Sequence, residues 1–93
     1  MWYLAKSKIH GVGIFTDKPL RMGDLVDVAI NKDRIVTEFG SKINHSWKQN
    51  SELYYLNGVY YIRASQFIPA DTELTSNYMN TPEFIRKPNP NWK

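Results

Sequence analysis

The sequence predicts a mainly β protein with several small sheets and little helix. β-branched and aromatic residues come in short runs separated by Gly, Asp, Asn and Pro, a pattern typical of short strands joined by turns. The dipeptide Asn57-Gly58 is a strong hairpin signal, because both residue types accept the positive φ angles of a tight type I′ turn. The chain has 93 residues, which is enough for one domain and leaves no room for a second core.

The strands are expected where the β-forming runs occur. These runs cover residues 2–5, 12–16, 25–30, 34–37, 59–64 and 73–76. The turn at Asn57-Gly58 would pair residues 52–56 with residues 59–63. Helix is expected only as a single turn over residues 81–86, with Thr81 as the N-cap and Pro82 at the first helical position.

Two segments share one order of residue types. Residues 16–26 and 65–75 each run from a strand through a turn with proline and a short polar turn into another strand. Pro19 and Pro69 mark the first turn in each segment. The two segments are therefore expected to have similar strand–turn–strand shapes.

Composition excludes several kinds of site. The chain has no cysteine, which rules out disulfides, iron–sulfur clusters and thiolate zinc sites. Its two histidines, His10 and His45, have no metal-ligand spacing, and a Ser-His-Asp hydrolase would need His45 to pair with its own neighbour Ser46. No metal is therefore expected.

Charge and hydropathy predict a soluble protein. The apolar runs are too short to span a bilayer, and no signal peptide is recognisable, so we expect a cytoplasmic protein that is neither exported nor membrane-bound. The net charge of +3 is too small to predict nucleic-acid binding.

Three short segments are candidates for a binding site, although each also has a purely structural explanation. The glycines of Gly11-Val12-Gly13 allow a backbone to come close to a ligand, or simply form a turn. Asn44 can offer a donor and an acceptor to a polar ligand, or bond its own backbone. His45 is expected to be packed and hydrogen-bonded. Tyr78 is either a catalytic residue or a half-buried tyrosine at a strand end.

In this order, these segments resemble the motifs of the SET-domain protein lysine methyltransferases. The resemblance covers about residues 5 to 79. The matching motifs are Ser7-x-x-x-Gly11-x-Gly13-x-Phe15, Gly23-Asp24 before a strand, Asn44-His45-Ser46 followed by Asn50, and Ile68 through Glu73-Leu74-Thr75 to Tyr78.

The resemblance implies a β-clip-like SET fold with a C-terminal pseudoknot, formed by the segments at Asn44 and Tyr78. It implies S-adenosylmethionine as cofactor, S-adenosylhomocysteine as product, and a lysine of another protein as substrate. The glycine-rich loop would touch the methionine part of the cofactor, Asn44 its amino group and the His45 backbone its adenine. Tyr78 would border the transferred methyl group. The residues implied for cofactor binding are Gly11, Val12, Gly13, Asn44, His45 and, in a tail over residues 79–93 that covers the site, Trp92.

The chemistry of such a transfer suits an aromatic site. A lysine must be neutral to attack a sulfonium methyl, and an apolar channel favours the neutral amine. Strand alternation means that only one of two consecutive tyrosines can face the channel. Its candidate residues are Tyr54, Tyr55, Tyr60, Tyr61 and Phe84.

The chain also departs from the family pattern. Only about 17 residues separate Val26 from Asn44, so the family's substrate-binding insert is nearly absent. Asp71 stands where the family pattern has glycine. Stand-alone proteins this small resemble viral members of the family, some of which are dimers, so a homodimer is one expectation.

Two rival hypotheses remain open at this point. The first is a catalytically inactive SET-like or β-clip-like binding module, which the missing insert would suit. The second is a small basic β-barrel that binds nucleic acid through Tyr60, Tyr61 and the basic tail. The second leaves the spacing of the motifs unexplained.

Overall fold

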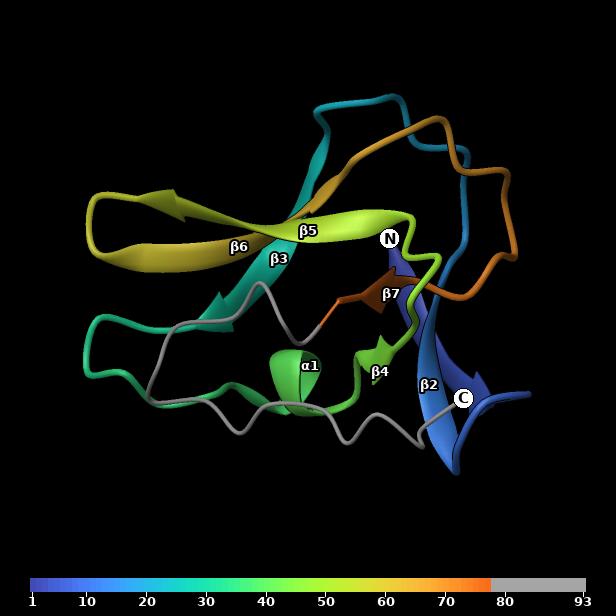
Figure 1. Ribbon diagram of the computed structural model, residues 1–93, viewed down its shortest axis with the longest axis horizontal. Coiled ribbons are helices and arrows are strands. Elements are labelled where there is room, and N and C mark those ends of the chain that lie inside the picture. The colour runs from blue at the N-terminus through green and yellow to red at the C-terminus, as the bar shows by residue number, and fades with distance from the viewer. Residues whose placement is uncertain (78–93) are drawn as a thin grey trace.

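Three small sheets and one short helix make up the fold (Figure 1). The computed structural model describes residues 1–77. Within that range the elements are β1 (Trp2–Lys6), β2 (Val12–Thr16), β3 (Leu25–Ile30), α1 (Glu38–Ser41), β4 (Asn44–His45), β5 (Ser51–Leu56), β6 (Val59–Ala64) and β7 (Thr75–Ser76). The sheets are β1–β2 and β3–β6–β5, both antiparallel, and β4–β7, which is parallel. The predicted fold class, mainly β with several small sheets and little helix, is confirmed.

The β5–β6 hairpin forms as predicted. Its two strands pair in one unbroken register from Ser51 opposite Ala64 to Leu56 opposite Val59. Asn57 and Gly58 have φ angles of 51° and 85°, both in the left-handed region that a type I′ turn requires. The turn residues therefore fix which residues lie opposite each other in the hairpin.

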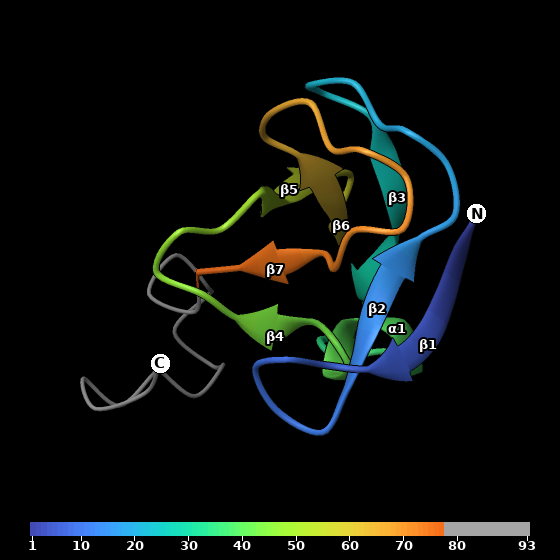
Figure 2. The ribbon, with the colours of Figure 1, turned by 90° about the vertical axis from the view of Figure 1, so that its right-hand side faces the viewer.

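The two segments with similar sequence patterns pair with each other. Residues 14–25 and 63–74 run antiparallel with the same offset from end to end, and we call this pairing the central ribbon (Figure 2). Its backbone bonds run from the N–H of Leu74 to Ile14 O (2.8 Å), Thr16 to Thr72 (3.1 Å), Leu20 to Ile68 (2.8 Å), Ile68 to Leu20 (2.9 Å) and Ala64 to Asp24 (2.9 Å). The ribbon brings residue 73 alongside β2.

The hydrophobic core lies under the central ribbon and the three-stranded sheet. Branched aliphatic side chains fill its centre, and the most deeply buried are Ile14, Ile62, Ile68 and Leu74. Three of these four come from the central ribbon. The pairing of the two segments is thus stabilised by the apolar area that they bury together.

The predicted strand over residues 34–37 is wrong. Only Val36 makes a β-bridge, opposite Ile30. The side-chain oxygen of Asn31 accepts the N–H groups of Asp33 (2.9 Å) and Ile35 (3.1 Å), which folds the backbone into a turn. A side chain thus satisfies backbone donors that a strand would have directed to a neighbour.

A short helix that the sequence did not predict follows this turn. Thr37 caps α1, because its Oγ1 accepts the N–H of Gly40 at 3.0 Å and donates to Val28 O at 2.6 Å. The helix then packs tightly on β3, since a Cβ on Gly40 would lie 2.2 Å from the Ala29 carbonyl oxygen. The predicted helical turn over residues 81–86 lies outside the described residues. No helix in the described part of the chain has the length and apolar character to cross a membrane.

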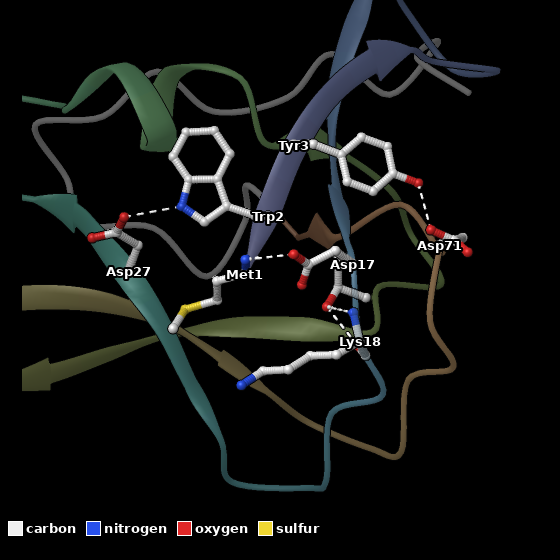
Figure 3. A network of polar contacts seen from close by, with 8 residues as sticks. Met1, Trp2, Tyr3, Asp17, Lys18, Asp27 and Asp71 are labelled. Atoms are coloured by element: carbon white, nitrogen blue, oxygen red, sulfur yellow. Dashed lines mark hydrogen bonds and ion pairs between the residues drawn. The ribbon is translucent and has the colours of Figure 1, made fainter.

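Polar contacts tie β1 to three other parts of the fold (Figure 3). They are the Met1 amine to Asp17 (2.6 Å), Trp2 Nε1–H to Asp27 (3.0 Å) and the Tyr3 hydroxyl to Asp71 (2.9 Å). Asp71, at the position where the family pattern has glycine, has a φ angle of 61°. The hydrogen bond from Tyr3 therefore holds a residue with an unfavourable backbone conformation.

Candidate functional site

The three motif segments meet beside β2. Asn44 and His45 of β4 pair in parallel with Thr75 and Ser76 of β7. Both views show β4 and β7 as neighbours near β2 (Figures 1 and 2). This parallel pairing brings the Asn-His-Ser segment next to the segment that leads to Tyr78, as the expected pseudoknot requires. Tyr78 itself lies outside the described residues.

Glu73 joins these segments through its side chain, and we call Ser7, Gly13, Asn44 and Glu73 the Glu73 cluster. The Ser7 hydroxyl lies 2.8 Å from both carboxylate oxygens, and Asn44 Nδ2 donates to Oε2 at 2.8 Å. Glu73 is half-buried, so these bonds to a charged acceptor are only partly screened by water. The carboxylate thus fixes the loop before β2 and the start of β4 relative to each other.

Ser7 also shapes the loop. Its Oγ accepts the backbone N–H groups of Ile9 (2.9 Å) and His10 (3.2 Å), and its own N–H donates to Gly11 O at 2.8 Å. The loop is therefore closed by local bonds before any ligand is considered.

The two glycines of the loop are required for different reasons. Gly11 has a φ angle of +50° with open space where a Cβ would be. Gly13 is buried, and a Cβ there would lie 2.2 Å from Glu73 Oε2 and 3.2 Å from Asn44 Nδ2. Gly11 thus meets a conformational requirement, whereas Gly13 makes room for the Glu73 carboxylate.

Asn44 uses the donor end of its amide within the protein. Besides Glu73, Nδ2 lies 3.1 Å from His10 O and 3.4 Å from Val12 O. The side chain is half-buried, and these bonds connect β4 to the glycine-rich loop. The predicted cofactor residues Gly11, Val12, Gly13 and Asn44 therefore lie together.

His45 is deeply buried, with 5% of its surface exposed. Burial lowers the pKa of its imidazole, so the ring is neutral at neutral pH. Its ring meets that of Trp47 edge to face, with 4.4 Å between centroids. The packed side chain agrees with the expectation that only the backbone of His45 would meet a ligand.

Asn50 holds β7 in place, a role that the sequence analysis did not assign. Its Oδ1 accepts the N–H of Thr75 at 3.0 Å, and its Nδ2 donates to Glu73 O at 2.8 Å. Ser51 donates its hydroxyl to Thr75 O. The spacing of Asn50 behind Asn44 was the available sequence signal, and the structure gives it a backbone-positioning role.

The four tyrosines of the hairpin divide between the two faces of the sheet. Tyr54 lies opposite Tyr61, and Tyr55 opposite Tyr60, so consecutive tyrosines point to opposite sides. Tyr60 packs against the core, with its ring 5.0 Å from that of Tyr55. On the other face Arg63 lies 4.1 Å over the Tyr54 ring and pairs with Glu52. The structure therefore brings together two pairs of the predicted channel residues, not all four.

Three predicted site residues lie outside the described part of the chain: Tyr78, Phe84 and Trp92. Sequence reasoning gave no role to Ser7 and Glu73, although both stand within the matched motifs. Their signal was the presence of polar residues in segments that otherwise alternate with buried ones.

No family model and no curated protein matches this chain. Among solved structures, it is similar to a Plasmodium falciparum protein provisionally described as a histone methyltransferase, with a TM-score of 0.65 and 18% sequence identity. The match covers 81% of this chain and 90% of that one. At this identity the likeness shows the fold alone. The chain therefore has a mainly β, SET-like fold of the kind found in a methyltransferase.

Proposed function

We propose that the protein is an S-adenosylmethionine-dependent protein lysine N-methyltransferase. The observation that carries this proposal is the Glu73 cluster, in which the glycine-rich loop, Asn44 and the last motif meet although up to 66 positions separate them. These are the segments to which the family resemblance assigns cofactor binding. The shared fold supports the same conclusion.

The described residues fit such a cofactor chemically. Asn44 directs its donor end into the protein, which leaves a carbonyl oxygen of the kind that accepts an ammonium group. The glycine-rich loop would hold the methionine part through its backbone, and the His45 backbone would meet the adenine. When bound, S-adenosylmethionine supplies an electrophilic methyl group.

The protein's remaining task is to hold a neutral lysine in line with that methyl group. Tyr78 would align the amine through its hydroxyl. A tyrosine pair from one face of the β5–β6 hairpin, together with Phe84, would exclude water and favour the neutral amine. The likeness to a protein provisionally described as a histone methyltransferase favours a protein substrate. Because the substrate-binding insert is nearly absent, a second copy of the chain is proposed to complete the peptide site.

The decisive experiment is incubation of the purified protein with methyl-labelled S-adenosylmethionine and cell extract. A labelled protein band, with label on lysine, is the expected result. Tyr78→Phe should bind S-adenosylhomocysteine normally and transfer methyl groups more slowly. If calorimetry detects no binding of either cofactor form, the proposal is wrong and a binding module is the better description.

A further inference from the structure

Asn44 presents a choice that decides which ligands it can bind. The two ends of an asparagine amide have nearly the same shape, but one only donates and the other only accepts hydrogen bonds. With the oxygen toward the ligand, the side chain attracts an ammonium group. With the nitrogen toward the ligand, it attracts a carboxylate. Whatever fixes the amide therefore fixes the specificity of the site.

We infer that Glu73 is a positioning residue that orients Asn44 so that its Oδ1 accepts the α-ammonium group of an adenosyl amino acid. The inference rests on the proposed function and adds a role that the motif match does not provide. Its basis is the surroundings of Nδ2, where all three neighbours are pure acceptors: Glu73 Oε2, His10 O and Val12 O. A flipped amide would place Oδ1 against three oxygens, which is electrostatically unfavourable.

Glu73 is the strongest of the three acceptors. Its bond to Nδ2 is 2.8 Å long, compared with 3.1 Å and 3.4 Å for the two carbonyls. It is also charged and half-buried, and such hydrogen bonds are stronger than neutral ones. The carboxylate therefore contributes most to holding the amide in this orientation.

The protein holds the carboxylate itself from two sides. The Ser7 Oγ already accepts two backbone N–H groups, so its own proton is directed to Glu73. Gly13 leaves the space into which the carboxylate fits. Ser7, Glu73 and Asn44 thus form a directed chain in which each hydroxyl or amide proton has one sense.

The experiment compares two ligands in calorimetry. S-adenosylhomocysteine carries the α-ammonium group, whereas 5′-methylthioadenosine has no amino-acid part. In Glu73→Gln the affinity for S-adenosylhomocysteine should fall about tenfold or more, because one charge-assisted bond is worth roughly 1.5–3 kcal/mol and tenfold is about 1.4 kcal/mol. The affinity for 5′-methylthioadenosine should stay nearly the same. Glu38→Gln, the same change at an exposed carboxylate, should alter neither affinity.

The ratio of the two affinities separates positioning from general damage. If Glu73→Gln weakens both ligands by the same factor, Glu73 is only structural and the inference is wrong. Ser7→Ala keeps the charge of Glu73 and loosens its anchor, so the ratio should fall there too. Failure of the wild type to bind S-adenosylhomocysteine would overturn the proposed function and this inference together. Normal binding with an unchanged ratio in both variants would overturn the inference alone.

A second measurement needs no ligand. In the ¹⁵N spectrum of the free protein, the side-chain NH₂ protons of Asn44 should exchange slowly with water, and Glu73→Gln should accelerate them. Fast exchange in the wild type, equal to that of the exposed Asn57, would contradict the proposed orientation.

Discussion

Residues of one type serve different physical purposes in this chain. Gly11, Gly23 and Gly58 have positive φ angles, whereas Gly13 and Gly40 are needed because another atom occupies the place of a Cβ. The sequence predicts the first group, because turns announce themselves locally. It could not predict the reason for Gly13, whose partner Glu73 is distant in sequence. For the same reason the residue spacing identified the candidate site, but not the bonds that hold it.

Replacement of Gly13 by alanine should therefore act through Glu73. The new Cβ would collide with the carboxylate, at a cost of about 1–3 kcal/mol of unfolding free energy. For a domain of this size, that lowers Tm by roughly 4–8 °C per kcal/mol. The shorter carboxylate of Glu73→Asp should partly rescue the variant in a double-mutant cycle. Strictly additive losses would contradict this account of Gly13.

His45 should make stability depend on pH. Because burial holds its pKa below the usual value of about 6.5, the unfolded chain binds a proton near that pH more readily than the folded protein does. The stabilisation is complete above about pH 6.5 and declines as the pH falls toward the folded pKa. Urea unfolding at pH 7.5 and pH 5.5 should show the loss, and His45→Gln should reduce the difference. An equal difference in both proteins would exclude His45 as its source.

At the scale of elements, local signals were right where they had no competitor. Strands β2, β3 and β6 match the predicted ranges, and β1 is one residue longer than expected. The run at residues 34–37 contains Ile35, Val36 and Thr37, which favour strands, yet the chain turns there. The Asn31 side chain and the Thr37 cap supplied bonds that composition does not reveal. The predicted strand over residues 73–76 shortens to β7 because Glu73 belongs to the ribbon and Asn44 pairs only from Thr75 onward.

The contact between α1 and β3 predicts that Gly40→Ala is destabilising. Alanine normally favours a helix over glycine by about 1 kcal/mol. Here the added Cβ would lie 2.2 Å from the Ala29 carbonyl oxygen, so the helix must move off the sheet. We expect a net loss of about 2 kcal/mol or more in thermal or urea unfolding. Ser41→Ala, at an exposed neighbouring position, is the matched control and should change stability little. A stabilised Gly40→Ala protein would show that the contact is not tight.

At the scale of the whole molecule, the central ribbon connects the fold to the site. The sequence showed that residues 16–26 and 65–75 resemble each other, but it did not show that they pair. That pairing depends on apolar side chains which meet only in three dimensions, such as Ile14 and Ile68 in the common core. Once the ribbon forms, Glu73 lies beside β2 and β7 lies beside β4. The site is therefore a consequence of long-range packing, which motif order indicates but cannot derive.

A ligand at this site should stabilise three distant segments together. Binding to the folded state alone adds about 2.7 kcal/mol when the ligand is at 100 times its Kd. With S-adenosylhomocysteine, Tm should therefore rise by roughly 10–20 °C. Hydrogen exchange should slow jointly in residues 7–13, 44–46 and 73–76, because the Glu73 cluster joins them. The turn at Asn57-Gly58 serves as the internal control, since its exchange reflects local opening of the hairpin. Protection of only one of the three segments would mean that the ligand binds elsewhere, whereas their common protection in wild type and its loss in Asn44→Ala would place it at this cluster.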